Sequence, residues 1–238
     1  SLENKRSIRE FDLLGISLPY EQLFTNVLNM LNLAGMPVRS EDRDETFPLV
    51  IAGGHACYNP EPMADFIDAF VIGEGEEIIL EIARTMQAMR GHSRFDQLRA
   101  IAQIQGMYVP RFYDVTYDES GVIIGTAPNV PEAPKRVLKR IVPTLPKPFT
   151  KFLIPNIDTV HNRAPIEIMR GCTRGCRFCH AGMITRPVRE RTVEEVMTAI
   201  QEIITSTGFE EISLLSLSSS DYVYVHELAD AVHEKYAD

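Results

Sequence analysis

Three of the four cysteines in this 238-residue chain lie within one short stretch, GCTRGCRFCHAG. They are Cys172, Cys176 and Cys179, and His180 follows directly. Thiolates and imidazoles are the side chains that hold zinc, haem iron and iron–sulfur clusters in proteins. Clustered cysteines do not resemble a disulfide framework, so they predict a metal centre in a reducing compartment, and we expect a cytoplasmic protein.

Three kinds of metal centre fit parts of this pattern. The CRFCH string matches the C-x-x-C-H haem-attachment signature, but that interpretation gives Cys172 no role. Zinc needs four ligands, which the three cysteines and His180 supply, with Cys57 as another source if the two halves fold together. The adjacent side chains of Cys179 and His180 diverge along the backbone, which counts against that set. A C-x3-C-x2-C loop suits an iron–sulfur cluster, in which three thiolates hold three irons and one iron stays open.

A strand and a helix are predicted on either side of the cysteines. PIEIMRGC, residues 165–172, is typical of a buried strand, and TVEEVMTAIQEIITSTG, residues 192–208, has a helical apolar stripe behind a capping box that begins at Thr192. The cysteine loop therefore follows the carboxyl end of a strand, where α/β enzymes place their chemistry. Gly171 and Gly175 would let its backbone pass close to a cluster.

The first half of the chain alternates between predicted strands and helices. Apolar runs at residues 11–18, 48–54 and 68–77 are typical of buried strands. Pro19 ends the first and glycine-rich turns end the other two, whereas residues 21–35, with an apolar stripe, and residues 76–91 are predicted as helices. This alternation predicts an α/β fold with a parallel, doubly wound sheet. Ligands of such sheets bind at the carboxyl ends of the strands.

The middle of the chain is expected to be less regular. Residues 106–125 predict a hairpin, and eight of the fifteen prolines fall between residues 128 and 165, which favours an extended connector. The second half again predicts alternating strands and helices, with a strand at 210–222 and a helix from Val225. The predicted domains are residues 1–91, residues 92–162 (the hairpin and a proline-rich basic connector) and residues 163–238.

Charge is unevenly distributed along the chain. The formal net charge is −9, yet residues 135–191 hold 13 Lys and Arg against three acids. This excess indicates either a surface for anionic groups, such as RNA phosphates, or a solvated connector whose arginines pair with acidic neighbours. No run approaches the ~18 apolar residues that span a bilayer, so no membrane partner is expected.

The string CTRGCRFC resembles the C-x3-C-x-aromatic-C signature of the radical S-adenosylmethionine (radical SAM) enzymes. The longer strings RAPIEIMRGCTRGCRFCHAGMITRPVRERTVEEV and TGFEEISLLSLSSSDY are similar to an uncharacterised branch of that superfamily, the B12-binding-domain radical SAM proteins. PLVIAGGHACYNPEPMADFIDAFVIGEGEE is similar to the second half of their cobalamin-binding-like domain. The resemblance implies a partial Rossmann-like, cobalamin-binding-type parallel sheet joined to the first βαβα units of a partial TIM-type radical SAM barrel.

The resemblance also implies roles for the residues around the cysteines. Cys172, Cys176 and Cys179 would ligate a 4Fe–4S cluster, whose open iron binds the amino and carboxylate groups of S-adenosylmethionine (SAM), and Phe178 would lie near the adenine. A Gly-Gly-Glu-like segment that usually holds the amino group is replaced here by LSLSSSDY. The substitutes are Ser216, Ser218, Ser220 and Asp221. The alternative is a serine-rich turn that caps the following helix.

Cobalamin binding is less clearly implied for the first half. The D-x-H-x-x-G loop of cobalamin-binding domains is absent from this chain. Ser17 and the pair Gly53 and Gly54 fall where other cobalamin-contacting segments would lie, and His55 is a candidate ligand. The alternative is a Rossmann-like domain kept for packing or substrate capture, in which Cys57 is a small buried residue.

The expected function is that of a radical SAM enzyme of the iron–sulfur oxidoreductase type. It would cleave SAM reductively to a 5′-deoxyadenosyl radical and modify an unidentified substrate, for which the basic segment suggests an RNA-linked molecule. An electron donor such as flavodoxin or ferredoxin is implied. The alternatives are a cobalamin-dependent radical SAM methyltransferase and a non-catalytic scaffold around zinc. Because two strands cannot close a barrel, we expect the chain to be a fragment that is inactive alone.

Overall fold

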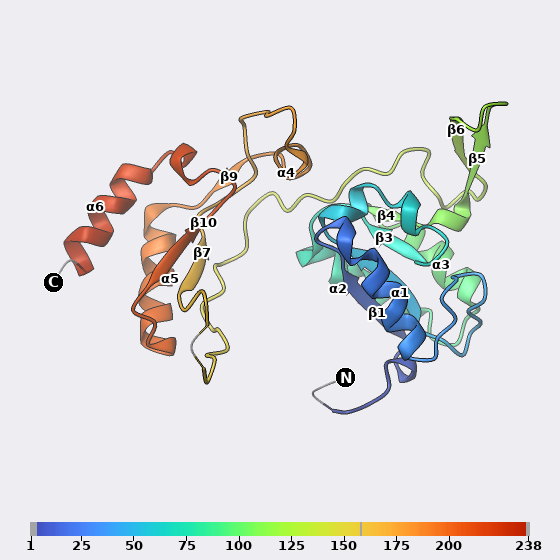
Figure 1. Ribbon diagram of the computed structural model, residues 1–238, viewed down its shortest axis with the longest axis horizontal. Helices are drawn as coiled ribbons and strands as arrows, with labels where there is room; N and C mark the ends of the chain where they lie inside the picture. The colour runs from blue at the N-terminus through green and yellow to red at the C-terminus, as the bar shows by residue number, and fades with distance from the viewer. Residues whose placement is uncertain (1–3, 158, 237–238) are drawn as a thin grey trace. The chain divides into compact units, whose positions relative to one another are not determined.

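The computed structural model describes residues 4–157 and 159–236, and Figure 1 shows its ribbon. The chain divides into two compact units, Ser1–Val142 and Pro143–Asp238. The division falls inside the segment 92–162 that the sequence predicts as a hairpin and connector. Each unit has its own hydrophobic core and is described on its own below.

A four-stranded sheet forms the centre of the first unit. Its strands lie in the order β1 (Leu13–Ser17), β2 (Leu49–Gly53), β3 (Ala69–Val71) and β4 (Met107–Tyr108). The first three are parallel, as predicted, but β4 pairs antiparallel with β3. The sheet is therefore mixed, and the prediction of an entirely parallel sheet is wrong for its fourth strand.

Two helices between β3 and β4 explain this reversal. They are α2 (Gly75–Ala88) and α3 (Arg94–Ala102). A single helix between two strands runs back along the sheet, so the second strand is parallel to the first. A second helix reverses the chain direction again, so the strand that follows is antiparallel. The sequence interpretation assigned no helix to 94–102, although Ser93 caps it by accepting a hydrogen bond from the Asp96 amide at 3.2 Å. The sequence predicts residues 107–108 as part of the hairpin, but they form β4 of the sheet instead, because the helical pair brings them beside β3.

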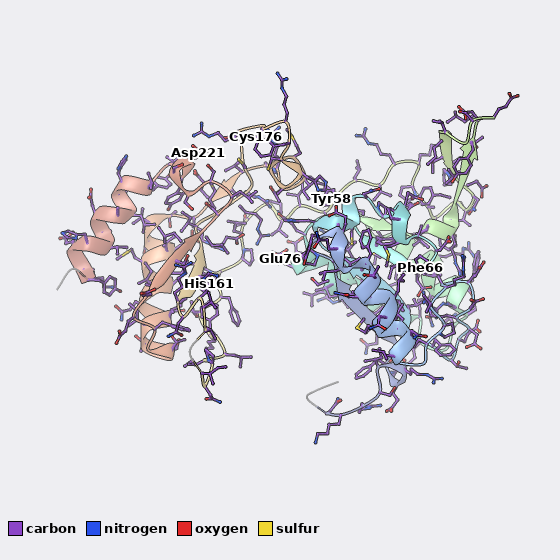
Figure 2. The ribbon with its side chains drawn as sticks, in the orientation of Figure 1. Tyr58, Phe66, Glu76, His161, Cys176 and Asp221 are labelled. Atoms are coloured by element: carbon purple, nitrogen blue, oxygen red, sulfur yellow. The ribbon has the colours of Figure 1, made fainter. Side chains whose placement is uncertain are left out.

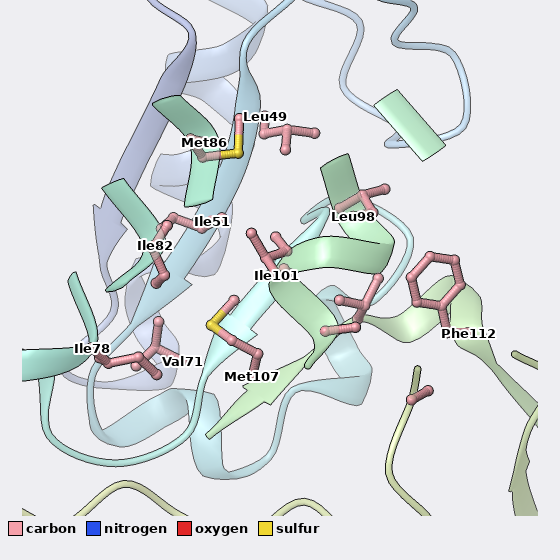
Figure 3. Close-up of a cluster of buried hydrophobic side chains, with 14 residues drawn as sticks. Leu49, Ile51, Val71, Ile78, Ile82, Met86, Leu98, Ile101, Met107 and Phe112 are labelled. Carbon is pink, nitrogen blue, oxygen red and sulfur yellow. The ribbon is translucent and has the colours of Figure 1, made fainter. Parts of the chain in front are cut away.

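Both faces of the sheet are buried. Leu49 and Ile51 of β2 pack with α2 and α3, as Figure 3 shows, whereas Val50 and Ala52 pack with α1 (Phe24–Leu33) on the other face. A strand covered on both sides needs apolar residues at every position. This is why PLVIAGG predicted a strand correctly without any alternation of polar residues.

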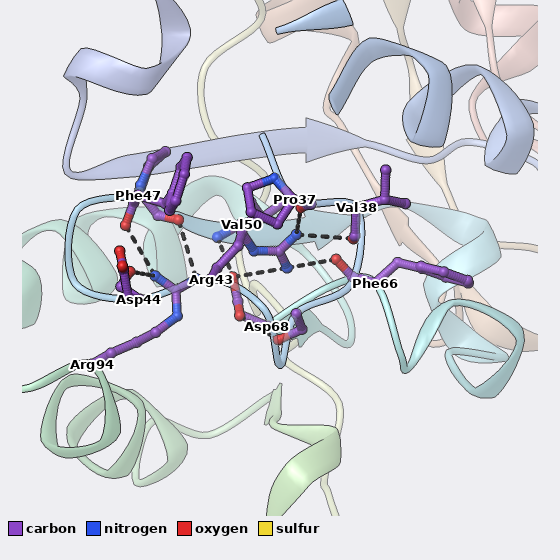
Figure 4. Close-up of polar contacts among 11 residues, drawn as sticks. Pro37, Val38, Arg43, Asp44, Phe47, Val50, Phe66, Asp68 and Arg94 are labelled. Carbon is purple, nitrogen blue, oxygen red and sulfur yellow. Dashed lines mark hydrogen bonds and ion pairs between the residues drawn. The ribbon is translucent and has the colours of Figure 1, made fainter. Parts of the chain in front are cut away.

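A buried ion-pair network ties the loop between α1 and β2 to the sheet (Figure 4). The Asp68 carboxylate accepts hydrogen bonds from the Val50 amide at 2.7 Å, from Arg94 at 2.6 Å and from Arg43 at 3.3 Å. The side chains of Asp68 and Arg43 are 0% exposed, and that of Arg94 is 6% exposed. Both guanidinium groups also donate to backbone carbonyls, Arg43 to Phe66 and Arg94 to residues 44, 47 and 48.

A hairpin and the first part of a connector complete the first unit. The hairpin consists of β5 (Tyr113–Tyr117) and β6 (Ile123–Pro128), so it is confirmed but begins later than predicted. From 129 to 157 and from 159 to 163, the described residues form no helix or strand, which agrees with the predicted connector. Arg140 in this connector pairs its backbone with Gly73 and its side chain with Glu77 and Glu81.

The second unit alternates strands and helices as predicted, with a small ladder added. Its elements are β7 (Ala164–Glu167), β8 (Met169–Arg170), α4 (His180–Ile184), β9 (Arg189–Glu190), α5 (Val193–Thr207), β10 (Ile212–Leu215) and α6 (Val225–Tyr236). β7 and β10 are parallel, whereas β8 and β9 are antiparallel. The predicted strand 165–172 is therefore two short strands with different partners.

The helix α5 forms as the sequence predicts. The Glu195 amide donates to the Thr192 hydroxyl at 3.2 Å, and the Thr192 amide donates to the Glu195 carboxylate at 3.0 Å, which completes the capping box. The helix ends at Gly208, whose φ of 71° suits glycine. Its apolar face packs against Ile166 and Ile168 in the core of the unit.

Among the described residues, no helix has both the length and the apolar character needed to cross a membrane.

Candidate functional site

The cysteine loop joins β8 to α4 in the second unit. Cys172 is 9% exposed, Cys179 is half-buried and Cys176 is exposed, and all three are free thiols. The Cys179 sulfur accepts a hydrogen bond from the Gly182 amide at 3.3 Å and so caps α4. The loop is thus fixed at its two ends, whereas its middle cysteine faces solvent.

Gly182 brings the first and third cysteines of the loop together. A Cβ at this position would lie 3.4 Å from the Cys179 sulfur and 3.8 Å from the Cys172 Cβ. A side chain at this position would therefore lie in contact with both cysteines. The sequence interpretation did not single out Gly182, although the small residues that follow the last cysteine, HAG, were a signal for close packing.

Gly171 and Gly175 make room for the chain's own atoms. Gly171 has a φ of 91°, and a Cβ there would lie 2.7 Å from the Pro187 carbonyl oxygen. Gly175 has a φ of 67°, and a Cβ there would lie 3.4 Å from a terminal nitrogen of Arg186. Gly171 therefore lies against the Pro187 carbonyl and Gly175 beside Arg186, and the approach of a cluster to these glycines stays a prediction.

The described residues do not form a single-ion site. No three Cys, His, Asp or Glu side chains between 4 and 157 or between 159 and 236 are arranged to hold one metal ion. Zinc would require its ligands to converge on one point. Cys57 lies buried in the core of the first unit, so it is not an exposed ligand either. In a four-iron cluster each thiolate binds a different iron, and the sulfurs stand apart around a cube.

Phe178 lies on the surface of the loop with 92% of its area exposed. No packing holds it there beyond its place before Cys179. An aromatic ring in this position is available to a ligand at low cost, because no contact in the core must be broken.

The serine-rich segment after β10 forms a hydrogen-bonded turn. The hydroxyls of Ser216 and Ser219 lie 2.8 Å apart, and the Ser218 hydroxyl donates to the Asp221 carboxylate at 2.7 Å. Residues Ser219–Asp221 form a single 3₁₀ turn. Of the predicted SAM contacts, the structure therefore brings Ser216, Ser218 and Asp221 into one turn, to which Ser220 also belongs.

Arg174 connects the cysteine loop to this turn. Its Nε donates to Asp221 Oδ2 at 2.6 Å, and a terminal nitrogen of the same guanidinium donates to Asp221 Oδ1. Figure 2 shows Cys176 and Asp221 at the same end of the second unit. The hydrogen bonds from Arg174 and Ser218 lower the pKa of Asp221, and the same pairing raises the pKa of Arg174. The sequence predicted Asp221 but not Arg174, because nothing local marks the partner.

Other arginines of the basic segment also have partners. Arg170 donates to Glu167 at 2.8 Å, and Arg186 donates to the Cys172 carbonyl at 3.3 Å. Arg191 is buried and donates to the Glu167 carbonyl at 2.7 Å. These contacts favour the interpretation of paired arginines over that of a free anion-binding surface for these residues.

In the first unit, the residues considered for cobalamin lie together at the carboxyl ends of β1 and β2. Ser17 is the register partner of Gly53, and both Ser17 and His55 are exposed. Gly54 has a φ of 117°, and a Cβ there would lie 2.5 Å from the Leu18 carbonyl oxygen. The space beside Gly54 is therefore filled by the chain itself.

Cys57 behaves as a core residue. It is 1% exposed and lies among apolar side chains of the second cluster of the first unit. Burial raises the pKa of its thiol to about 12, so the side chain is neutral at physiological pH. This agrees with the predicted role of a small buried residue.

Two family profiles match the chain. The profile described as "Radical SAM proteins, N-terminal" matches residues 1–110, and the profile described as "Radical SAM superfamily" matches residues 166–237. The second match contains the cysteine loop and the turn after β10.

One curated relative and one solved structure extend this similarity. The uncharacterized protein MJ0966 of Methanocaldococcus jannaschii is 27% identical over 96% of this chain and 43% of its own length. The radical SAM methyltransferase TsrM from Kitasatospora setae, solved with cobalamin and a 4Fe–4S cluster bound, shares the fold with a TM-score of 0.53 and 15% identity. That match covers 97% of this chain and 43% of TsrM, so the chain spans less than half of either protein.

Each matched range lies within one of the two units described above. The chain therefore matches radical SAM family models in both units, the N-terminal model in its first unit and the superfamily model in its second.

Proposed function

We propose that the second unit holds a 4Fe–4S cluster through Cys172, Cys176 and Cys179 and binds SAM at the iron that these residues leave open. The observation that carries this proposal is the arrangement of three free thiols on one loop between β8 and α4, inside the range that matches the superfamily. A radical SAM domain implies both cofactors, and the donor set of three thiols suits the cluster.

When bound, the cluster supplies the electron that cleaves the sulfonium of SAM to methionine and a 5′-deoxyadenosyl radical, which abstracts hydrogen from a substrate. The residues of this chain position these partners. The three thiolates hold the metal, Phe178 offers an exposed ring for the adenine, and the turn that contains Ser216, Ser218 and Ser220 lies ready to accept hydrogen bonds from the amino group.

The finer fold assignment belongs to the same proposal. The first unit is a partial Rossmann-like domain of the cobalamin-binding type, and β7, α5, β10 and α6 are the first βαβα units of a partial TIM-type barrel. The parallel pairing of β7 and β10 with α5 between them supports the barrel assignment. An electron donor, such as flavodoxin or ferredoxin, completes the proposal. The substrate pocket would need more strands than the second unit has, so we expect no turnover from this chain alone.

Electron paramagnetic resonance tests the proposal. The chain is reconstituted anaerobically with iron and sulfide, reduced with dithionite and titrated with SAM. Binding of SAM to the open iron would change the spectrum of the reduced cluster. We expect this change in the native chain and in Cys57→Ala, but expect neither cluster nor change in Cys176→Ala. A native cluster whose spectrum does not respond to saturating SAM would refute the proposal.

A second candidate function is cobalamin-dependent methyl transfer. It is favoured by the fold shared with TsrM, whose structure contains cobalamin, and by the adjacency of Ser17 and Gly53. The fit of the residues is incomplete. The Leu18 backbone fills the space beside Gly54, which leaves Ser17, Gly53 and His55 as the groups that a ligand could meet.

The two candidates are separated by a simple binding experiment. The chain is mixed with hydroxocobalamin and desalted, and the absorbance of the retained cofactor is measured. Because the Leu18 backbone fills the space beside Gly54, we expect no retention. Stoichiometric retention, lost in His55→Ala, would favour the methyltransferase.

A further inference from the structure

We infer that Arg174 and Asp221 form a clasp that holds the cysteine loop and the turn after β10 together, and that Asp221 acts through Arg174 rather than as an independent contact to SAM. This inference rests on the proposed function, because SAM would bind between the two segments. Both residues are positioning residues, and the sequence interpretation had assigned Asp221 a direct role.

The geometry of the pair supports this role. Two nitrogens of the Arg174 guanidinium engage the two oxygens of Asp221, which is the bidentate arrangement that fixes orientation as well as distance. The residues are 47 positions apart, so the pair joins two loops that the backbone does not hold together locally. Arg174 lies between Cys172 and Cys176, so the ion pair with Asp221 ties the turn after β10 to the cysteine loop itself.

The hydrogen-bonding capacity of Asp221 is largely used within the chain. Arg174 occupies both oxygens, and the Ser218 hydroxyl donates to Oδ2 at 2.7 Å. A ligand amino group that approached this carboxylate would compete with a charged partner that is already bound to both oxygens. The hydroxyls of Ser216 and Ser219, which bond only weakly to each other as neutral groups, are easier to recruit.

A second arginine holds the loop from its other side. Arg186 donates to the Cys172 carbonyl at 3.3 Å and lies against Gly175. The loop is therefore held between two guanidinium groups, one from within the loop and one from the segment after α4. Arg174 reaches the turn after β10 through Asp221, so this pair links the turn to the cysteine loop.

A double-mutant cycle on SAM affinity tests the inference. Arg174→Gln, Asp221→Asn and the double variant are loaded with iron and sulfide, their iron content is matched, and SAM affinity is measured from the change in the spectrum of the reduced cluster. Because Arg174 is 61% exposed, the pair is worth little in isolation, and we expect each single variant to weaken SAM binding by about fivefold. The double variant should be no weaker than either single variant, because both lose the same interaction.

Two further variants sharpen the cycle. Arg174→Lys keeps the positive charge but cannot form the two parallel hydrogen bonds of a guanidinium, so it should retain only part of the affinity for SAM. Arg177→Gln removes a positive charge from an exposed residue of the same loop and should bind SAM like the native chain. An affinity loss from Asp221→Asn that persists undiminished in the Arg174→Gln background would show that Asp221 contacts SAM directly, and would overturn the inference.

Hydrogen exchange in the metal-free chain tests the clasp without cluster or SAM. Arg174→Gln and Asp221→Asn should raise the exchange rate of residues 173–178 and of residues 216–222 together, and Arg177→Gln should not. Unchanged exchange in both segments would overturn the clasp, even if the native chain binds SAM. Conversely, a native chain that fails to load a cluster, yet shows the paired change in exchange, would refute the proposed function and keep the clasp.

Discussion

The carbonyl oxygen of Leu18 lies 2.5 Å from the position that a Cβ on Gly54 would occupy. The chain leaves β1 at Leu18, whose amide donates to the Gly53 carbonyl at 2.7 Å and whose carbonyl accepts from the Ala56 amide at 3.0 Å. The glycine pair at the end of β2 thus lets the segment after β1 fold over β2. In the first unit, these glycines serve the chain's own packing at the edge where a ligand would be sought.

Gly54→Ala should destabilise the first unit. The new methyl group would meet the Leu18 backbone, and the φ of 117° is strained for any residue with a side chain. We expect the free energy of unfolding to fall by about 2 kcal/mol or more, measured by urea denaturation. Gly15→Ala is the control, because a Cβ there has no neighbour within 4 Å. Equal stability of the two variants would contradict this account of Gly54.

Asp68→Asn should be among the most destabilising single changes in the first unit. It leaves the buried guanidinium groups of Arg43 and Arg94 without their counter-charge. Removing one partner of a buried ion pair costs about 3–5 kcal/mol. The matched control is Asp12→Asn, which breaks the exposed pair with Arg90 and should cost less than about 1 kcal/mol. A small effect at Asp68, of the size seen at Asp12, would mean that the network does not anchor the loop.

Cys57 should resist alkylation in the folded chain. Burial raises the pKa of its thiol to about 12, so little thiolate forms at pH 8. Iodoacetamide should therefore react with Cys57 only after the chain unfolds. Because the pKa of this thiol is higher in the folded chain than in the unfolded chain, the unfolded chain loses the proton at a lower pH than the folded chain does. The contribution of Cys57 to stability is therefore complete below the unfolded pKa near 9 and declines between pH 9 and about 12. Mass spectrometry of the Cys172, Cys176 and Cys179 to Ser triple variant measures the labelling. Rapid labelling of Cys57 under native conditions would contradict its burial.

Gly171→Ala should reduce the iron content of the reconstituted chain. A methyl group at this position would press on the Pro187 carbonyl at 2.7 Å and push Cys172 out of place. We expect iron retention to fall at least severalfold after desalting, whereas Gly75→Ala, where a Cβ has no neighbour within 4 Å, should retain iron like the native chain. Retention of iron by Gly171→Ala would show that the loop tolerates a shift of its first cysteine.

The parts of the fold that the sequence predicts are those with strong local signals. The capping box at Thr192, the glycine at 208 and the apolar stripe between them specify α5 without help from the rest of the chain. The doubly buried run of β2 and the cysteine spacing are equally local. Each of these features can be recognised from neighbouring residues alone.

The parts that the sequence does not predict depend on distant partners. The strands β4, β8 and β9 have two residues each, too few to show an alternating pattern. Each of these strands forms only because the fold places another segment beside it, with which it pairs. The pairing of Arg174 with Asp221 could not be predicted for the same reason. A surface arginine can pair with many acidic residues, and the fold determines which of them lies within reach.

The most direct test of the central claim is the metal content of the chain. The native chain, Cys172→Ala, Cys176→Ala, Cys179→Ala and the control Cys57→Ala are reconstituted anaerobically with iron, sulfide and equimolar zinc, desalted and analysed for both metals and for sulfide. The proposed function predicts about four irons and four sulfides per chain in the native protein and in Cys57→Ala, and loss of iron in each of the other three variants. One zinc per chain with no iron would contradict it.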